Sequence, residues 1–324
     1  MIKSRYKKKN SLFKYLLLFL IFTLVLSLAS MLFSNKGTSS SGGKDNNELR
    51  IQPYCEYDWT IRFENAQGGL RIYIPTDNGY INYNIVHSIS KGANEDIWRM
   101  SHAYACDENL KNSYAITTDA EWDMALMLQG RNDFIGGNAH GDEVYTSFEM
   151  YIDGKEVDIT EVKELTSFEE ITIRVESIGY DPNDHTTEAL KHFKEYIITA
   201  DGVLLNQRVE WLNDYTLGSS YMAMMPPAKT YTNMFYLDNY PTPRECNGNF
   251  GYYSGAKKAV VYGENFTFTM SISKYPSLTG GNYFLMTDNG GGAYNKMYFV
   301  LCNGASVKNG DVWETSTFYQ ITNS

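Results

Sequence analysis

The chain of 324 residues has a mass of 36.9 kDa, and 43% of its residues are hydrophobic and 20% charged, which is typical of a globular protein and excludes a disordered one. The charge is divided unevenly: residues 1–50 carry nine basic and two acidic side chains, whereas residues 51–324 carry 19 basic and 36 acidic ones. Such an acidic body lacks the clustered Lys and Arg that bind phosphates, so no nucleic acid is expected as a partner.

The N-terminus predicts export and a membrane anchor. Residues 3–14 are strongly basic, and no charged residue follows between Tyr15 and Ser34. As a helix this run would span about 30 Å, the thickness of the hydrocarbon core. Its basic flank would stay in the cytoplasm, so residues 15–34 are expected to form a single transmembrane helix, and residues 1–34 together a signal-anchor in the cell membrane, with the body extracellular. The alternative is a signal peptide cleaved after Ala29, which would release a secreted protein.

A linker separates this anchor from the body. Residues 35–48 are rich in Gly and Ser and contain no apolar side chain to bury, so they predict a flexible connection to one domain at 49–324. The four cysteines, Cys55, Cys106, Cys246 and Cys302, form no C-x-x-C pair. Neither a metal nor any other cofactor is therefore predicted, and disulfides and free thiols both remain open.

The body predicts an all-β fold, a large antiparallel β-sandwich of the supersandwich or jelly-roll type. Asp153-Gly154 and Asp201-Gly202 are hairpin signals, each between two predicted strands. Two short helices are also expected, at Thr186–Phe193 and Ile159–Leu165. The predicted strands are apolar or alternate between apolar and polar residues, and are Tyr57–Phe63, Leu70–Ile74, Tyr80–Val86, Trp122–Leu128, Ser147–Ile152, Glu156–Ile159, Phe168–Ser177, Lys194–Ala200, Val203–Leu212, Asn265–Ser273, Tyr298–Leu301 and Val312–Ile321.

Tyrosine is unusually frequent, with 26 in the chain. Many lie among Asn, Gly and Asp, as in residues 231–240 and 249–253. Flat amphipathic rings beside amides and carboxylates suit a sugar, whose C–H faces pack on aromatic rings. The alternative is that these tyrosines only reflect the strand preference of aromatic residues.

A glycine-rich loop at residues 136–143 holds the densest group of ionisable side chains. Glycines there let the backbone approach a ligand closely. His140 is the candidate general base, and Asp142 or Glu143 would orient it. Because these two carboxylates point to opposite faces, only one of them is expected to join His140. The alternative is an ordinary surface turn, and no second His completes a metal-binding motif.

Two further groups are candidates for substrate contact. Trp98 and Arg99 would bind substrate, Arg99 by clamping a carboxylate, and Tyr104 would supply a proton to a leaving glycosidic oxygen. Alternatively, Trp98 is a core anchor and Arg99 forms a structural ion pair. Late in the chain, Lys296 and Tyr298 are two residues apart on a predicted strand and share one face, where they would bind an acidic sugar and protonate a leaving group. An ordinary edge-strand lysine is the alternative.

The stretch Trp122–Pro226 resembles the large antiparallel sheets of galactose-mutarotase-like and polysaccharide-lyase β-supersandwich domains. The resemblance lies in the general residue pattern of four segments rather than in a diagnostic motif. It implies a β-supersandwich fold and a function on carbohydrate. These segments are His140-Gly-Asp142-Glu143, the Asp153-Gly154 hairpin, His192-Phe-Lys-Glu-Tyr196 and the run from Asp201 to Trp211.

Together these features predict an exported, membrane-tethered protein that acts on extracellular polysaccharide. In a lyase, His140 would remove the proton α to a uronic carboxylate, Arg99 or Lys296 would stabilise the enediolate, and Tyr104 or Tyr298 would be the acid.

In a hydrolase, two carboxylates would flank the glycosidic bond, and Asp142, Glu143 and Glu149 are the candidates. The main alternative to both enzymes is a non-catalytic glycan-binding or adhesion module. A structural protein of a cell wall or phage is a third possibility.

Overall fold

The computed structural model describes residues 49–53, 67–110, 113–138, 140–162, 166–247, 251–277, 282–288, 292–301 and 304–324. The predicted transmembrane helix at 1–34, the linker at 35–48, the predicted strand Tyr57–Phe63, and Cys55 and Cys302 lie outside these residues. Within the described part of the chain, no helix is both long and apolar enough to cross a membrane.

The described residues form two β-sheets, and all but one of the pairings in them are antiparallel, the exception being a short parallel contact between β4 and β8. The larger sheet runs in the order β10-β1-β2-β3-β4-β8-β11-β12-β13-β23-β19-β18-β15-β16, with β5 on β4 and β9 on β8. Its strands are β1 (Leu49–Pro53), β2 (Gln67–Thr76), β3 (Gly79–Ser90), β4 (Glu95–Cys106), β5 (Ser113–Ala115), β8 (Glu143–Ile152), β9 (Lys155–Glu156), β10 (Thr166–Phe168), β11 (Ile171–Tyr180), β12 (Glu188–Thr199), β13 (Gly202–Trp211), β15 (Met234–Leu237), β16 (Tyr240–Glu245), β18 (Lys258–Tyr262), β19 (Phe266–Lys274) and β23 (Val312–Asn323).

The smaller sheet runs in the order β17-β20-β21-β14-β6-β7, with β22 on β14. Its strands are β6 (Ala125–Leu128), β7 (Phe134–Gly136), β14 (Tyr215–Met225), β17 (Gly251–Ser254), β20 (Asn282–Thr287), β21 (Lys296–Leu301) and β22 (Ser306–Val307). The helical elements of the described chain are three 3₁₀ turns, η1 (Lys91–Ala93), η2 (Ile159–Glu161) and η3 (Lys229–Tyr231).

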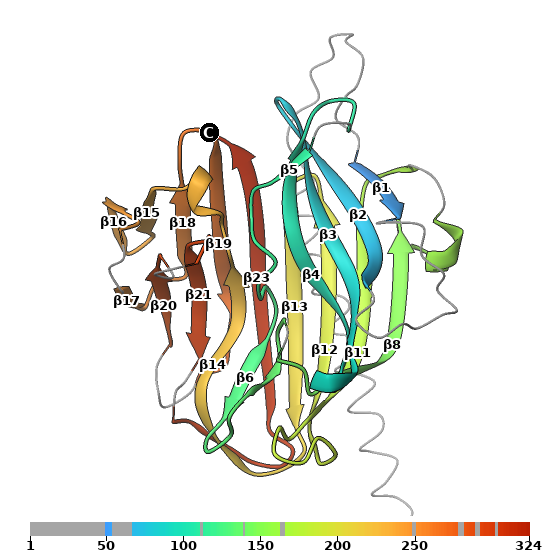
Figure 1. Ribbon diagram of the computed structural model, residues 1–324, viewed down its shortest axis with the longest axis vertical. Helices are drawn as coiled ribbons and strands as arrows, with labels where there is room; N and C mark the ends of the chain where they lie inside the picture. The colour runs from blue at the N-terminus through green and yellow to red at the C-terminus, as the bar shows by residue number, and fades with distance from the viewer. Residues whose placement is uncertain are drawn as a thin grey trace, which may run out of the picture. The chain divides into compact units, whose positions relative to one another are not determined.

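The strands form two layers with the core between them, which confirms the predicted β-sandwich, and the larger sheet contributes strands to both layers. Figure 1 shows β2, β3 and β4 in front of β11 and β12, and β14 and β21 in front of the strands around β19 and β23. Strand β11 shows how alternate side chains are buried: its Ile171, Ile173 and Val175 all enter the core. The small sheet therefore has one face in the core and another that faces outward.

One predicted hairpin illustrates how the sequence specifies the turns. Asp153 and Gly154 join β8 to β9 with φ of 50° and 75°, and both residue types tolerate this left-handed conformation. Asp201-Gly202 likewise joins β12 to β13, as predicted.

The two predicted helices are not found as such. Thr186–Phe193 was expected to be helical, but β12 begins at Glu188 and continues as a central strand of the large sheet. Alternate residues of β12 are buried, which is the period of a strand. At Ile159–Leu165 the structure has only the single turn η2, capped by the Asp158 side chain, and residues 163–165 lie outside the described part.

The last strand in the large sheet's order, β16, has an unusual composition. All six of its residues, Tyr240 to Glu245, are exposed, and they include Pro241 and Pro243. Proline lacks the N–H that a strand interior needs, so it is found at sheet edges.

Candidate functional site

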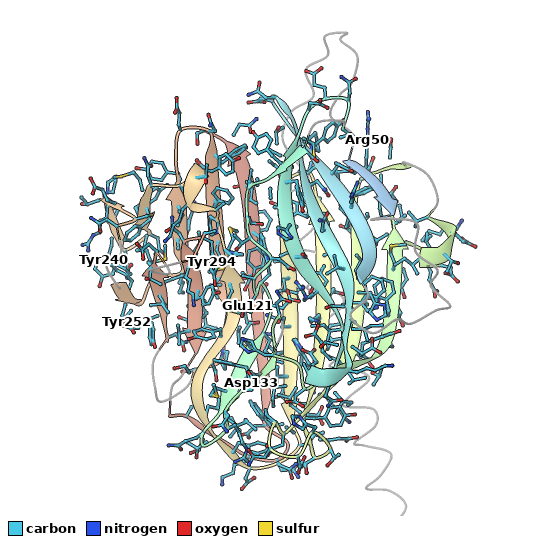
Figure 2. The ribbon with its side chains drawn as sticks, in the orientation of Figure 1. Arg50, Glu121, Asp133, Tyr240, Tyr252 and Tyr294 are labelled. Atoms are coloured by element: carbon cyan, nitrogen blue, oxygen red, sulfur yellow. The ribbon has the colours of Figure 1, made fainter. Side chains whose placement is uncertain are left out.

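The outward side of the small sheet carries a row of aromatic rings, here called the aromatic face and defined as Phe134, Tyr221, Tyr252, Tyr283 and Tyr298. The ring centroids of Tyr221 and Tyr298 are 5.3 Å apart, and those of Tyr252 and Tyr283 are 5.1 Å apart. Phe134 stacks on Tyr221 at 6.0 Å. Tyr298 is 3% exposed and Tyr252, labelled in Figure 2, is 64% exposed, so the row extends from a buried end to solvent.

At the buried end of the aromatic face lies an acid–imidazole cluster formed by Glu121, Asp133, His140 and Tyr298. His140 contacts Asp133 Oδ1 through Nδ1 at 2.7 Å and Glu121 Oε1 through Nε2 at 3.1 Å. The Tyr298 hydroxyl donates to the other Glu121 oxygen at 3.0 Å. The His140 side chain is 29% exposed, so solvent reaches the cluster from one side.

Close backbone approach at Gly137 makes this cluster possible. A Cβ at that position would lie 3.1 Å from Glu121 Cγ and 3.2 Å from His140 Cδ2, and its φ of +78° disfavours any other residue. Gly141 is still more constrained, because a Cβ there would lie 1.7 Å from the carbonyl oxygen of Ala93. The prediction of a glycine-dependent loop around His140 is therefore confirmed.

The ionisation states follow from these contacts. Burial raises the pKa of Glu121, but hydrogen bonds from His140 and Tyr298 outweigh it, and the net pKa is lowered. The hydrogen bond to Glu121 raises the pKa of His140 in spite of partial burial. Burial, reinforced by the Glu121 charge, raises the pKa of Tyr298 well above 10. The contacts with two carboxylates thus favour the protonated form of His140, while Glu121 favours its ionised form and Tyr298 its neutral phenol.

This arrangement defines what the cluster can do chemically. Both ring nitrogens of His140 donate to carboxylates, so a role as general base requires one carboxylate to release a nitrogen. The carboxylates beside His140 are Glu121 and Asp133, and not Asp142 or Glu143 as the sequence predicted.

The structure brings three of the predicted site residues together. Lys296 Nζ lies 5.1 Å from the centroid of the Tyr298 ring, and Tyr298 is joined to His140 through Glu121. Glu121 was not predicted as a site residue. The only feature of the sequence that pointed to it was its position, as an acidic residue immediately before the apolar run that begins at Trp122.

Arg99 is buried next to the cluster and makes structural contacts. Its Nη1 donates to Asp119 Oδ1 at 2.9 Å, and its Nη2 donates to Asn138 Oδ1 at 2.8 Å. Since Asn138 belongs to the same loop as His140, Arg99 holds that loop in place. This is the ion-pair alternative that the sequence left open for Arg99.

Trp98 and Tyr104 lie away from His140. Trp98 is buried in the main core, where its ring stacks on His87 at 4.9 Å and packs on Phe148 at 4.2 Å. Tyr104 packs against a separate group that contains Tyr80 and Cys106. The core-anchor alternative thus describes Trp98, and the structure does not bring Tyr104 to the acid–imidazole cluster.

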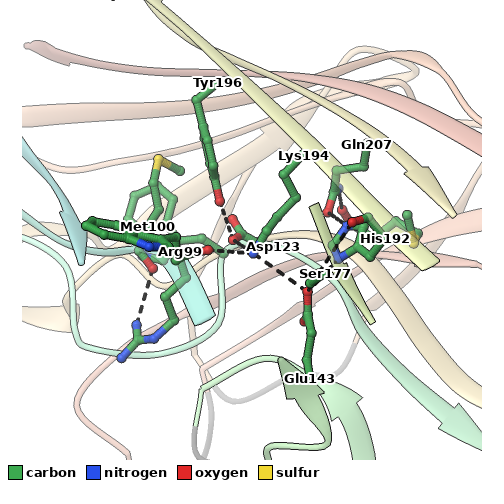
Figure 3. Close-up of polar contacts among 12 residues, drawn as sticks. Arg99, Met100, Asp123, Glu143, Ser177, His192, Lys194, Tyr196 and Gln207 are labelled. Atoms are coloured by element: carbon green, nitrogen blue, oxygen red, sulfur yellow. Dashed lines mark hydrogen bonds and ion pairs between the residues drawn. The ribbon is translucent and has the colours of Figure 1, made fainter. Parts of the chain in front are cut away.

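Asp142 and Glu143 are both buried and turn to other partners. Asp142 Oδ1 contacts His185 Nδ1 at 2.7 Å. Glu143 belongs to a buried polar network defined as Asp123, Glu143, His192, Lys194 and Tyr196 (Figure 3).

The buried polar network is closely connected. Glu143 Oε1 accepts from His192 Nδ1 at 2.9 Å and lies 3.9 Å from Lys194 Nζ. Lys194 also lies 3.4 Å from Asp123, which accepts the hydroxyl of Tyr196. Burial raises the pKa of Glu143, but Lys194 and His192 outweigh it and bring the pKa down to about 2.

The described residues contain no group of three His, Cys, Asp or Glu side chains arranged to hold a metal ion. Cys106 and Cys246 are free thiols, and burial raises their pKa to about 11 and about 12, which makes them poor nucleophiles.

No protein-family model matches the chain, and no curated protein matches it by sequence. Among solved structures, it is similar to the galactosidase domain of an alpha-galactosidase-sucrose kinase, with 8% identity and a TM-score of 0.45; the match covers 78% of this chain and 40% of that one. It is also similar to a galactose mutarotase-like protein from Clostridium acetobutylicum, with 10% identity and a TM-score of 0.44 over 86% of this chain and 99% of that one. A galactose mutarotase-like protein from Lactobacillus casei matches with 10% identity and a TM-score of 0.39, over 78% of this chain and 99% of that one. The mutarotase-like proteins belong to the group that the sequence resembles, and at these scores no residue's role follows from them.

Proposed function

We propose that the body binds extracellular carbohydrate through the aromatic face. The observation that carries this proposal is the row of rings that leads from exposed Tyr252 to the acid–imidazole cluster. Sugar rings pack their C–H faces on such rings, while carboxylates, imidazolium and phenol at one end bond to hydroxyl groups.

Charge favours a neutral or mildly polar sugar at this site. The two carboxylates of the cluster are balanced by the His140 imidazolium and by the Lys296 ammonium over the Tyr298 ring. The tyrosines stay neutral because burial raises the pKa of Tyr221 and Tyr283. A neutral surface rich in donors and acceptors pays no large desolvation cost when an uncharged glycan covers it.

The binding test is a titration of the full-length protein, in mild detergent, with a panel of neutral and acidic polysaccharides. Tyr252→Ala is expected to weaken binding about tenfold, since exposed aromatic platforms contribute most of such binding energy. Tyr240→Ala is the matched control, because Tyr240 is also exposed but lies outside the aromatic face. Equal affinity for wild type and Tyr252→Ala would contradict the proposal.

Catalysis on the bound glycan is the second candidate, favoured by the placement of Glu121 between an imidazole and a phenol. Tyr298, neutral because of its raised pKa, would supply the proton to a leaving oxygen. A lyase would produce unsaturated ends that absorb in the ultraviolet, and a hydrolase would produce new reducing ends. Loss of either product in Glu121→Gln, with binding retained, is the expected result.

We also propose that residues 15–34 anchor the protein in the membrane. It rests on the basic flank and the uncharged run that follows it. Protease added outside intact cells is expected to digest the body, and full-length protein recovered from the cytosol would argue against the anchor.

A further inference from the structure

A cavity opens at another place on the sandwich, away from the candidate site described above, and it shares no residue with the aromatic face. Its volume is about 430 Å³, within the range of about 300–1,000 Å³ in which small-molecule sites fall. It lies between the turn that joins β2 to β3, the ends of β4 and β5, the turn before β19 and the end of β23. Figure 1 shows β5 and the end marked C on the same side of the molecule.

Aromatic rings form part of this cavity's wall. Tyr114 is 48% exposed, yet its ring is held by Tyr231 at 5.5 Å and by Phe266 at 6.2 Å, centroid to centroid. A ring that is fixed by its neighbours and open to solvent on one side presents a platform at little cost in conformational entropy. Phe266 and Tyr80 are buried and complete the apolar part of the lining.

Polar side chains form the remainder. Three amides line the cavity, from Asn78, Asn265 and Asn323, and each amide carries both donors and acceptors. Asn323 Nδ2 donates to Thr76 Oγ1 at 3.2 Å, which ties the end of β23 to the end of β2. The wall thus combines the β2–β3 turn with the end of β23, and a hydrogen bond joins these two segments.

The charged side chains that line the cavity are the carboxylates Asp107 and Glu264. Arg50 contacts a lining residue, with its guanidinium 5.3 Å from the centroid of the Tyr80 ring. Two carboxylates in the lining disfavour an anionic ligand, and the amides beside them suit an uncharged one.

We infer that this cavity binds a neutral sugar residue, as a second carbohydrate site independent of the aromatic face. The aromatic platform of Tyr114 accepts the C–H face of a pyranose ring, and the amides of Asn78, Asn265 and Asn323 bond to its hydroxyl groups. A body with two such sites on one polysaccharide holds it more tightly than either site alone.

The test uses saturation-transfer NMR on the full-length protein in mild detergent, with D-glucose, D-galactose, D-mannose and D-glucuronate as probes. The background variant is Tyr252→Ala combined with Tyr283→Ala, which disables the aromatic face and leaves the cavity intact. In this background we expect a signal from at least one of the three neutral sugars and a weaker one, or none, from glucuronate. Adding Tyr114→Ala is expected to weaken binding about tenfold.

Tyr240→Ala, added to the same background, is the matched control for the loss of an exposed tyrosine and is expected to leave the signal unchanged. The inference fails if no neutral sugar gives a signal in the background variant, if glucuronate binds best, or if Tyr114→Ala leaves the affinity unchanged. The aromatic face is tested separately in the single variant Tyr114→Ala, which lacks the ring of the cavity and keeps the aromatic face intact. Failure at one site therefore does not imply failure at the other.

Discussion

His140 and His192 each contact a carboxylate, but one lies on the outward side of the small sheet and the other in the interior of the sandwich. His140 is 29% exposed and bridges Glu121 and Asp133. His192 is fully buried and contacts Glu143 and Gln207. The same pair of groups thus occurs in two environments within one domain.

The difference shows that the burial of an imidazole–carboxylate contact decides whether it serves stability or ligand binding. In the buried polar network every charge depends on its partners, because a buried ion without them would be very costly. In the acid–imidazole cluster, water can replace a lost partner, so the groups are free to exchange a contact for a ligand. We therefore expect substitutions in the network to change stability and those in the cluster to change ligand binding.

The largest effect is expected for Lys194→Met. Lys194 is 1% exposed, and its loss removes the ammonium that lies beside both Asp123 and Glu143, which leaves Glu143 with its contact to His192. Breaking a buried pair in this way costs about 3–5 kcal/mol. Urea unfolding measures it, and Lys191→Met, an exposed lysine of the same strand, is the control that should change little. A small effect for Lys194→Met would remove the contrast between the two regions.

Acid is expected to weaken the network next. The folded pKa of Glu143 is about 2, below its ordinary value of 4.5, so its contribution is fully present above pH 4.5 and is lost as the pH falls toward 2. The shift corresponds to roughly 3 kcal/mol. Unfolding free energies measured across this window should fall less steeply for Glu143→Gln than for wild type. Glu188→Gln, at an exposed position, should keep the wild-type slope.

Tyr196→Phe is expected to have an intermediate effect. It removes the hydroxyl that donates to Asp123 and leaves a buried carboxylate oxygen with one partner fewer. Such losses cost about 1–3 kcal/mol. Thermal unfolding should detect this, while Tyr252→Phe at the surface should unfold like wild type. An unchanged unfolding temperature for Tyr196→Phe would mean that the network tolerates gaps.

The smallest stability effect is expected for His140→Ala, within about 1 kcal/mol, because the pairs at this position are partly exposed. The pKa of His140 is raised by folding, so its contribution is present below pH 6.5 and is lost as the pH rises through the folded pKa. The variant should therefore differ from wild type more at pH 5.5 than at pH 9. A loss larger than that of Tyr196→Phe would place His140 among the structural histidines.

The strands were predictable where alternation is visible in hydrophobicity. Phe168–Ser177 alternates through Ile171, Ile173 and Val175, and the structure has β11 at Ile171–Tyr180. The following strand, β12, was predicted only from Lys194 onward, and its first half was expected to be helical. An inward position in that half is His192, and a pattern of apolar residues cannot show a period whose inward positions are polar, so the start of β12 was concealed.

The candidate site was predictable only in part, for a related reason. The glycines around His140 are a local signal, and they led to the loop. The partners of His140 depend on contacts distant in sequence, since Tyr298 reaches Glu121 across 177 residues. Only the pairing of β14 with both β6 and β21 brings these segments together.

Strand β16 has a consequence for how molecules of this protein meet. An open sheet edge presents unpaired N–H groups on which a strand from another molecule can add. In β16, Pro241 and Pro243 are two residues apart, so the donors that they lack would have pointed to the same side of the strand. Arg244 and Glu245 add charge to the same segment. Two prolines and two charges along this edge disfavour the addition of a strand from another copy of the protein.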